Sequence, residues 1–535
     1  MHVRPHPALV FAIIFATIFV LHLPLLSLPY FWDEAGYYVP AARDLLLTGS
    51  LIPHTTVSNA HPPLVMAWLA LWWKFVGYAP AVTRSAMLFV AAFSLTGLFR
   101  LAESVSNTRV AIACTACTAL YPVFFAQSSL AQVDLAAAGL TFWALCAWFE
   151  ERPVKVAVWF SLAALAKETA ILAPLALAIW LAAGWIVPRN GVFGKLWSHD
   201  ESTSGSPARR IFPLLAPVVP LLLWYLYHYI RTGYVFGNPE FFRYNVAETL
   251  NPVRFLLALG LRLWQVFGYL HLWFMTLGML LAMLFPPVQQ HDASRGRIPI
   301  PAQMIFLVIL VTCVVAMALI GGAVLARYML PVTPLVILVG VSTLWRRLHY
   351  WTIAVSAIAI AFVLAWFWNP PYGFAPEDNL AYRDYVVMHQ RAETFLEARY
   401  PMAHVLTAWP ASDELSRPWL GYTTRPMQVV RVEDFSLEQM LSAADYSGHF
   451  EAALVFSTKY EPVHALSERW SKWRDLKRKF FGFHQDLPPS FAAKILGGRV
   501  VYSEELQGQW VAVIEIPRSE IENAVLRSPA GSHLP

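Results

Sequence analysis

The chain has 535 residues, of which 57% are hydrophobic and only 14% are charged. Soluble domains carry a charged fraction of about 25%, so this composition, with a mean hydropathy of +0.49, excludes an ordinary soluble protein and indicates a polytopic membrane protein. The net charge of +5 is modest and lies in small clusters between apolar runs. It gives no indication of nucleic-acid binding, and we use the clusters as markers of membrane topology.

The first apolar run, residues 9–30, is longer than the core of a cleavable signal peptide, which spans about 7–15 residues. We therefore interpret it as a first membrane span whose N-terminus lies in the cytosol. Asp33 and Glu34 follow it directly, and carboxylates at a membrane boundary are functional candidates because charge is costly near hydrocarbon. The alternative is that both merely cap the span with water-facing charge.

Runs of ~17–25 apolar residues predict about eleven membrane helices. In chain order they cover residues 9–30, 81–100, 109–126, 135–150, 154–169, 170–187, 211–230, 255–285, 302–322, 329–345 and 350–369. The apolar run within residues 62–80 is too short to cross, so we expect it to lie at the membrane surface. An amphipathic helix over residues 36–48 is expected beside it, with Arg43 and Asp44 on its polar face.

Charge clusters test this assignment independently. If residues 62–80 do not cross, 13 Lys and Arg side chains near the spans face the cytosol and 8 face outside. If they do cross, the bias reverses, contrary to the positive-inside rule. The first outer loop is therefore predicted over residues 31–80, and the Gly/Ser-rich segment 188–210 is predicted to be a flexible cytosolic loop.

After residue 370 the chain becomes far more charged. Strands are predicted over residues 404–409, 427–432, 452–458 and 510–516, and helices over 379–399, 434–444 and 464–480. This alternation predicts an α/β domain over residues 371–535, with a disordered tail from residue 528. An odd number of spans places this domain on the outer, extracytoplasmic face.

The predicted outer face also carries the polar side chains that are hardest to explain as ordinary parts of membrane helices. They are Asp33, Glu34, His61, the polar turn from Gln127-Ser128-Ser129 through Asp134, the break Lys167-Glu168-Thr169, and Arg327-Tyr328. Asp33-Glu34-x-x-Tyr37, His61-Pro62-Pro63, Asp134 at the start of a span, Lys167-Glu168-Thr169 and Arg327-Tyr328-x-x-Pro331-x-x-Pro334 occur in this order. The set resembles the GT-C glycosyltransferases that use polyprenyl-phosphate sugars, and within them the bacterial relatives of protein O-mannosyltransferases and of the lipid A aminoarabinose transferase.

The resemblance covers roughly residues 9–345. It implies a bacterial inner-membrane enzyme that transfers a sugar from a polyprenyl-phosphate carrier to a lipid, protein or glycan acceptor on the outer face, with inversion. The family's catalytic carboxylate corresponds to Asp33, and Glu34 completes its acidic pair. Relatives vary at His61 and after Lys167, and their metal dependence also varies.

Chemistry suggests roles for the remaining candidates. Lys167 and Arg327, with Arg84 as a third cation, are predicted to hold the donor phosphate. Substrate contacts are predicted for Tyr37, His61, Asp134, Glu168 and Tyr328. A divalent metal held by Asp33, His61 and Asp134 is a further hypothesis.

Each role has a structural alternative. The two cations could extend to lipid headgroups, Glu168 could neutralise Lys167, and Asp134 could stabilise a helix N-terminus. For the whole chain, a polytopic transporter or lipid flippase and a scaffold protein are the alternative functions. The polar groups cluster at one face and no inverted repeat is evident, which disfavours a transporter.

Overall fold

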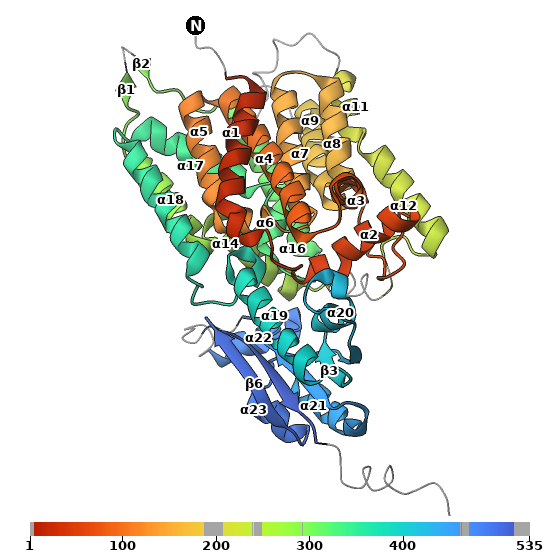
Figure 1. The fold of residues 1–535 in the computed structure, drawn as a ribbon. Coiled ribbons are helices and arrows are strands. Elements are labelled where there is room, and N and C mark those ends of the chain that lie inside the picture. Colours follow the sequence, from red (N-terminus) through yellow and green to blue (C-terminus); the bar gives the residue numbers. More distant parts are fainter. Residues whose placement is uncertain are drawn as a thin grey trace, which may run out of the picture. The chain divides into compact units, whose positions relative to one another are not determined.

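The computed structural model describes residues 5–186, 207–237, 239, 249–290, 293–320, 322–460, 462 and 470–517. Most of the predicted cytosolic loop, Arg243 and the predicted tail lie outside these residues. The chain divides into two compact units (Figure 1). The first comprises Met1–Ser27, Tyr37–Trp368 and Glu377–Leu380, and the second comprises Leu28–Gly36, Asn369–Pro376 and Ala381–Pro535.

The first unit is helical, and each predicted span coincides with a helix or a pair of helices. These are α1 (Pro7–His22) with η1 (Leu23–Leu25), α4 (Pro80–Val105), α5 (Thr108–Leu120) with α6 (Pro122–Gln127), α7 (Asp134–Phe149), α8 (Pro153–Ala166), α9 (Leu172–Ile186), α11 (Pro207–Leu215) with α12 (Val218–Thr232), α14 (Pro252–Phe267) with α15 (Leu272–Ala282), α16 (Ile300–Leu319), α17 (Thr333–Arg347) and α18 (Trp351–Phe367). Five described helical segments are long and apolar enough to cross a membrane by length and composition. The number of crossings stays a prediction.

Three predicted spans are interrupted, and each interruption has a local cause. Pro122 starts α6 after an extended Tyr121, and Pro217 precedes α12. Between α14 and α15, Leu270 and His271 have positive φ angles of 44° and 69°. Such backbone angles end an α-helix for residues with a side chain, so 255–285 is two helices rather than one.

The two helices of the first outer loop are α2 (Val39–Thr48) and α3 (Leu64–Val76). Asp44 differs from its predicted place on the polar face of α2, because its side chain is buried. Its Oδ2 accepts hydrogen bonds from the backbone N–H groups of His54 and Thr55, at 2.6 and 2.7 Å. Asp44 therefore fixes the loop between α2 and α3.

A small hairpin, β1 (Gln289–Gln290) and β2 (Ala293–Ser294), connects α15 to α16. Arg295 next to the hairpin donates a 2.6 Å hydrogen bond to the carbonyl oxygen of Trp345 near the end of α17. The hairpin therefore lies beside the C-terminal end of α17. The polar helix breaks described below lie at the other, N-terminal end of α17.

The second unit contains a five-stranded mixed sheet in the order β4-β3-β5-β7-β6. Its strands are β3 (His404–Ala408), β4 (Gln428–Val432), β5 (Ala452–Phe456), β6 (Arg499–Leu506) and β7 (Gln509–Glu515). Strands β4, β3 and β5 are parallel, whereas β7 is antiparallel to both β5 and β6. Every residue of the central strand β5 is buried, as expected for a strand covered on both faces.

Helices α19 (Ala381–Arg399), α20 (Ala411–Ser416), α21 (Leu437–Ala444), α22 (Ser471–Phe481) and α23 (Pro489–Ile495) complete the second unit. Both α19 and α23 pack against β6 and β7. The predicted strands coincide with β3, β4, β5 and β7, and the predicted helices with α19, α21 and α22. Strand β6 and helices α20 and α23 were not predicted.

The acidic segment after the first span differs from its predicted place in the membrane domain, because Leu28–Gly36 belongs to the second unit. The reason is aromatic packing. The ring of Phe31 lies 5.2 Å from that of Tyr385, and the ring of Trp32 lies 5.3 Å from that of Trp409. The hydroxyl of Tyr422 donates a 2.9 Å hydrogen bond to the carbonyl oxygen of Tyr30. The segment is thus a structural part of the C-terminal domain.

Candidate active site

A buried cluster of charged side chains forms in the first unit where several helices are interrupted. Asp134 is the first residue of α7, and Lys167 lies in the extended break between α8 and η3 (Glu168–Ile171). Arg327 belongs to η7 (Ala326–Met329), just before α17. A helix break exposes backbone groups that polar side chains can satisfy. All three residues lie where the apolar pattern of the sequence stops.

Asp134 joins the two cations. Its Oδ1 lies 2.5 Å from Nζ of Lys167, and its Oδ2 lies 3.4 Å from Nε of Arg327. All three side chains are buried. Buried charges persist only when they are paired, so Asp134 holds the two cations at one point.

Arg327 has further partners. Its Nη1 donates to Oε1 of Gln132 at 2.5 Å and to Oε2 of Glu377 at 2.6 Å. Gln132 donates in turn to the same Glu377 oxygen at 3.0 Å. Both partners are buried, so the guanidinium has a fixed orientation.

The ring of Tyr328 lies against three cations. Its centroid is 3.9 Å from Nζ of Lys167, 5.4 Å from Cζ of Arg262 and 5.6 Å from Cζ of Arg327. Aromatic faces attract cations. Three cations therefore converge on one aromatic ring, beside the carboxylates of Asp134 and Glu377.

A second group continues from Glu168, the residue after Lys167. Its Oε2 lies 3.0 Å from Nδ1 of His61, whose ring lies 5.9 Å from that of Tyr37. Burial raises the pKa of the Tyr37 phenol to about 12, which keeps it a neutral hydroxyl. The loop before His61 is fixed by Trp224, which donates a 2.8 Å hydrogen bond to the carbonyl oxygen of Ala60.

Arg84 is buried on α4 and donates a 2.9 Å hydrogen bond to the carbonyl oxygen of Ser129. This contact fixes the polar turn that leads to Gln132 and Asp134. The role of Arg84 as a third phosphate-binding cation stays a prediction.

No protein-family model and no curated protein matches the chain. Among solved structures it is similar to ArnT from Cupriavidus metallidurans bound to undecaprenyl phosphate, with 13% identity, a TM-score of 0.54 and coverage of 95% of this chain and 97% of that one. The apo structure of the same protein matches with a TM-score of 0.51, at 13% identity and with coverage of 95% and 98%. Archaeal oligosaccharyltransferase AglB from Archaeoglobus fulgidus matches at 12% identity, with a TM-score of 0.47 and coverage of 95% and 74%.

The chain has the GT-C fold. It is an integral membrane protein whose GT-C fold brings four predicted site residues together. These are Asp134, Lys167, Arg327 and Tyr328. Tyr37, His61 and Glu168 form the adjacent group.

The two predicted catalytic carboxylates, which lie in the second unit, have different surroundings. Glu34 is completely buried, and its Oε2 accepts a 2.9 Å hydrogen bond from the backbone N–H of Phe31. Asp33 is half-buried at the start of a π-helical turn, Glu34–Tyr38. Such turns are frequent at functional sites. Glu34 therefore holds the turn, and Asp33 is the more accessible carboxylate.

The metal hypothesis for Asp33, His61 and Asp134 gains no support. His61 faces Glu168, whereas Asp134 faces Lys167 and Arg327. A carboxylate already bound by two cations is a poor metal ligand because their charges repel the metal.

Sequence reasoning missed Gln132, Arg262 and Glu377. Arg262 was detectable as an Arg in the interior of an apolar helix, which is a functional signal in a membrane segment. It donates to the carbonyl oxygens of Leu325 and Met317, at 2.7 and 3.3 Å, and so supports the chain just before Arg327. Glu377 gave no signal among the many charges beyond residue 370.

Proposed function

We propose that this protein is a membrane glycosyltransferase that moves a sugar from a polyprenyl-phosphate carrier to an acceptor on the outer face of the membrane, with inversion at the anomeric carbon. The observation that carries this proposal is the buried pair of cations, Lys167 and Arg327, held at one point by Asp134 in a GT-C fold. ArnT from Cupriavidus metallidurans, which shares this fold, has been crystallised with undecaprenyl phosphate.

The leaving group sets the first requirement. As the bond between the anomeric carbon and the phosphate oxygen breaks, that oxygen takes the electron pair and gains negative charge. Lys167 and Arg327 would stabilise this charge in a largely dry site, where such interactions are strongest. Asp134 would keep the two cations aligned before the donor arrives, and Tyr328 would fix the position of the Lys167 ammonium.

The attacking group sets the second requirement. The acceptor hydroxyl must lose its proton as its oxygen bonds to the anomeric carbon, and we assign Asp33 as the general base that takes it. Glu34 would act as a positioning residue, because its carboxylate is committed to the backbone of Phe31. Tyr37, His61 and Glu168 would contact the sugar or the acceptor, with Tyr37 as a neutral hydrogen-bond donor.

Replacing Asp33 by Asn tests the proposal. The variant keeps the size of the side chain but cannot take a proton, so we expect sugar transfer from a polyprenyl-phosphate donor to fall by about 10²–10⁴-fold. Expression and thermal unfolding in detergent should match the wild type. Unchanged transfer would exclude Asp33 as the base. Loss of transport of the unmodified lipid, with no glycosyl product in the wild type, would favour the flippase alternative.

A further inference from the structure

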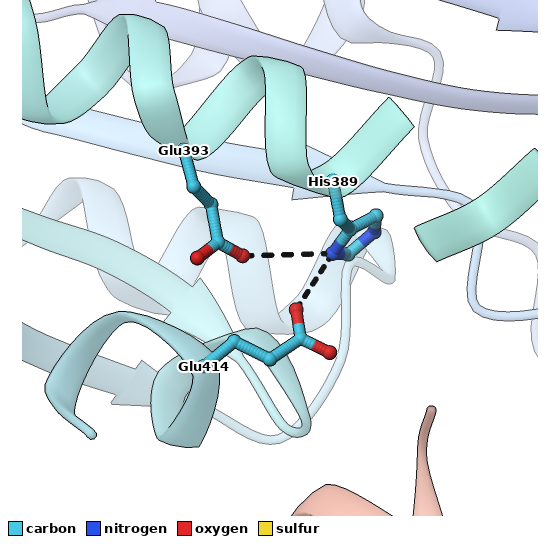
Figure 2. A group of neighbouring side chains, drawn as sticks. All are labelled: His389, Glu393 and Glu414. Carbon is cyan, nitrogen blue, oxygen red and sulfur yellow. Dashed lines mark hydrogen bonds and ion pairs between the residues drawn. The ribbon is translucent and has the colours of Figure 1, made fainter. Parts of the chain in front are cut away.

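A second buried cluster lies in the C-terminal unit, apart from any residue assigned above. His389 and Glu393 are four residues apart on α19, so they share one face of the helix. Glu414 reaches them from α20 (Figure 2). Nδ1 of His389 lies 2.8 Å from Oε2 of Glu414 and 3.8 Å from Oε1 of Glu393. All three side chains are at most 1% exposed.

The charges in this cluster are not balanced by the described protein groups. Neither carboxylate has a Lys or Arg partner among the described residues, and both oxygens of Glu393 and Oε1 of Glu414 lack a hydrogen-bond partner there. Two carboxylates buried beside one imidazole are unfavourable unless something neutralises them. A structure that keeps them in contact must therefore supply protons or a cation.

Protons give a partial solution. Burial, and then the neighbouring Glu414, raises the pKa of the Glu393 carboxyl well above its usual range. One shared proton between the carboxylates still leaves several oxygens without donors. A divalent cation would neutralise both carboxylates with His389 neutral, and it would also occupy the unpartnered oxygens.

We propose that His389, Glu393 and Glu414 bind a divalent first-row transition metal, for which Zn²⁺ is the best match. Imidazole nitrogen and carboxylate oxygen are ligands of this class of ion. The three ligand atoms lie within 4.8 Å of one another, and atoms that share a tetrahedral zinc are about 3.3–3.6 Å apart for bonds of about 2.0–2.2 Å. The free carboxylate oxygens can complete the coordination through bidentate binding.

The surroundings make this a closed, structural site. The ring of Tyr385 stacks on His389 at 3.8 Å, and the ring of Phe456 lies 4.7 Å away. Tyr385 also contacts the rings of Phe31 and Trp32, at 5.2 and 5.7 Å. The metal would therefore support the aromatic platform that carries the segment Leu28–Gly36.

The test uses the full-length protein in detergent. Protein purified without added metal should contain about one zinc ion per chain, as measured by elemental mass spectrometry. A strong chelator should remove it and lower the unfolding temperature, and ZnCl₂ should restore both. Glu414→Gln should weaken Zn²⁺ binding by more than ~100-fold, because even outer-shell changes cause losses of 10–100-fold. Glu397→Gln, on the same helix outside the cluster, should bind as the wild type does.

Two results with Zn²⁺ would overturn the proposal. One is wild-type protein that holds no metal and gains no thermal stability from ZnCl₂. The other is full Zn²⁺ binding by Glu414→Gln. Co²⁺ provides a readout if a variant folds poorly, because its absorption bands in the wild-type protein report nitrogen and oxygen ligation directly. Absence of these bands in folded, Co²⁺-treated wild-type protein would leave the carboxylates neutralised by a shared proton.

Discussion

Two buried clusters of charged side chains, one in each unit, differ in how their charges are paired. Around Asp134, the cations Lys167 and Arg327 are each paired with a carboxylate. Around His389, two carboxylates face one imidazole, with no Lys or Arg partner among the described residues. Comparable burial with different pairing implies different ligands. The first cluster offers cations to an anion such as a phosphate, and the second offers carboxylates to a cation.

The largest expected effect comes from removing the carboxylate that joins the cations. Asp134→Asn leaves Lys167 and Arg327 buried without their shared counter-charge, which should destabilise the protein by about 3–5 kcal/mol. The measurement is the apparent unfolding temperature in detergent. Undecaprenyl phosphate should then stabilise this variant more than the wild type, because the phosphate replaces the missing negative charge. Equal stabilisation of both proteins would show that the anion binds elsewhere.

Lys167→Met should lower sugar transfer by about 10²–10³-fold, since it removes one cation that stabilises the developing phosphate charge. Initial rates at varied donor concentration separate weaker donor binding from a slower step. Lys155→Met is the matched control, because Lys155 is exposed at the start of α8, and it should transfer at the wild-type rate. A Lys167→Met variant with normal transfer would contradict the role of this cluster.

The second cluster should make the stability of the folded protein depend on pH. Since burial and Glu414 raise the pKa of Glu393, metal-depleted folded protein holds a proton that the unfolded chain loses above about pH 4.3. Stability should therefore fall as pH rises from that value towards the raised pKa, by at most about 1.4 kcal/mol per pH unit. Unfolding temperatures across this range check the slope.

Glu393→Gln should flatten that slope, because the amide does not titrate. Zn²⁺ should flatten it in the wild type by replacing the proton. A slope that both changes leave untouched would place the titrating group elsewhere.

The smallest effect is expected at Glu34. Glu34→Gln keeps an oxygen that can accept the hydrogen bond from Phe31, so transfer should stay within about threefold of the wild type. The same assay applied to Asp33→Asn provides the comparison. A loss at Glu34→Gln as large as that at Asp33→Asn would assign the chemistry to both carboxylates.

Much of the helical unit could be predicted because long apolar runs leave few alternatives to membrane helices. The breaks in those runs also indicated Asp134, Lys167 and Arg327 as candidate site residues. Their ion pairs could not be predicted, since they join helix ends separated by many residues. Likewise, nothing in residues 28–36 indicated that Phe31 and Trp32 pack against Tyr385 in the C-terminal unit.

In that unit, strand β6 was missed because its sequence includes Ser503, Glu504 and Glu505, which are typical of a loop. It is the outer strand of the sheet and pairs only with β7, so a polar face is tolerated there. His389 and Glu393 have the spacing of neighbours on a helix. The third member, Glu414, comes from another helix, so the cluster required the tertiary structure.

The most direct measurement is a structure of the full-length protein with undecaprenyl phosphate bound. The proposed function predicts phosphate oxygens within about 2.7–3.2 Å of Lys167 Nζ and of the Arg327 guanidinium. A phosphate bound away from both cations would contradict it.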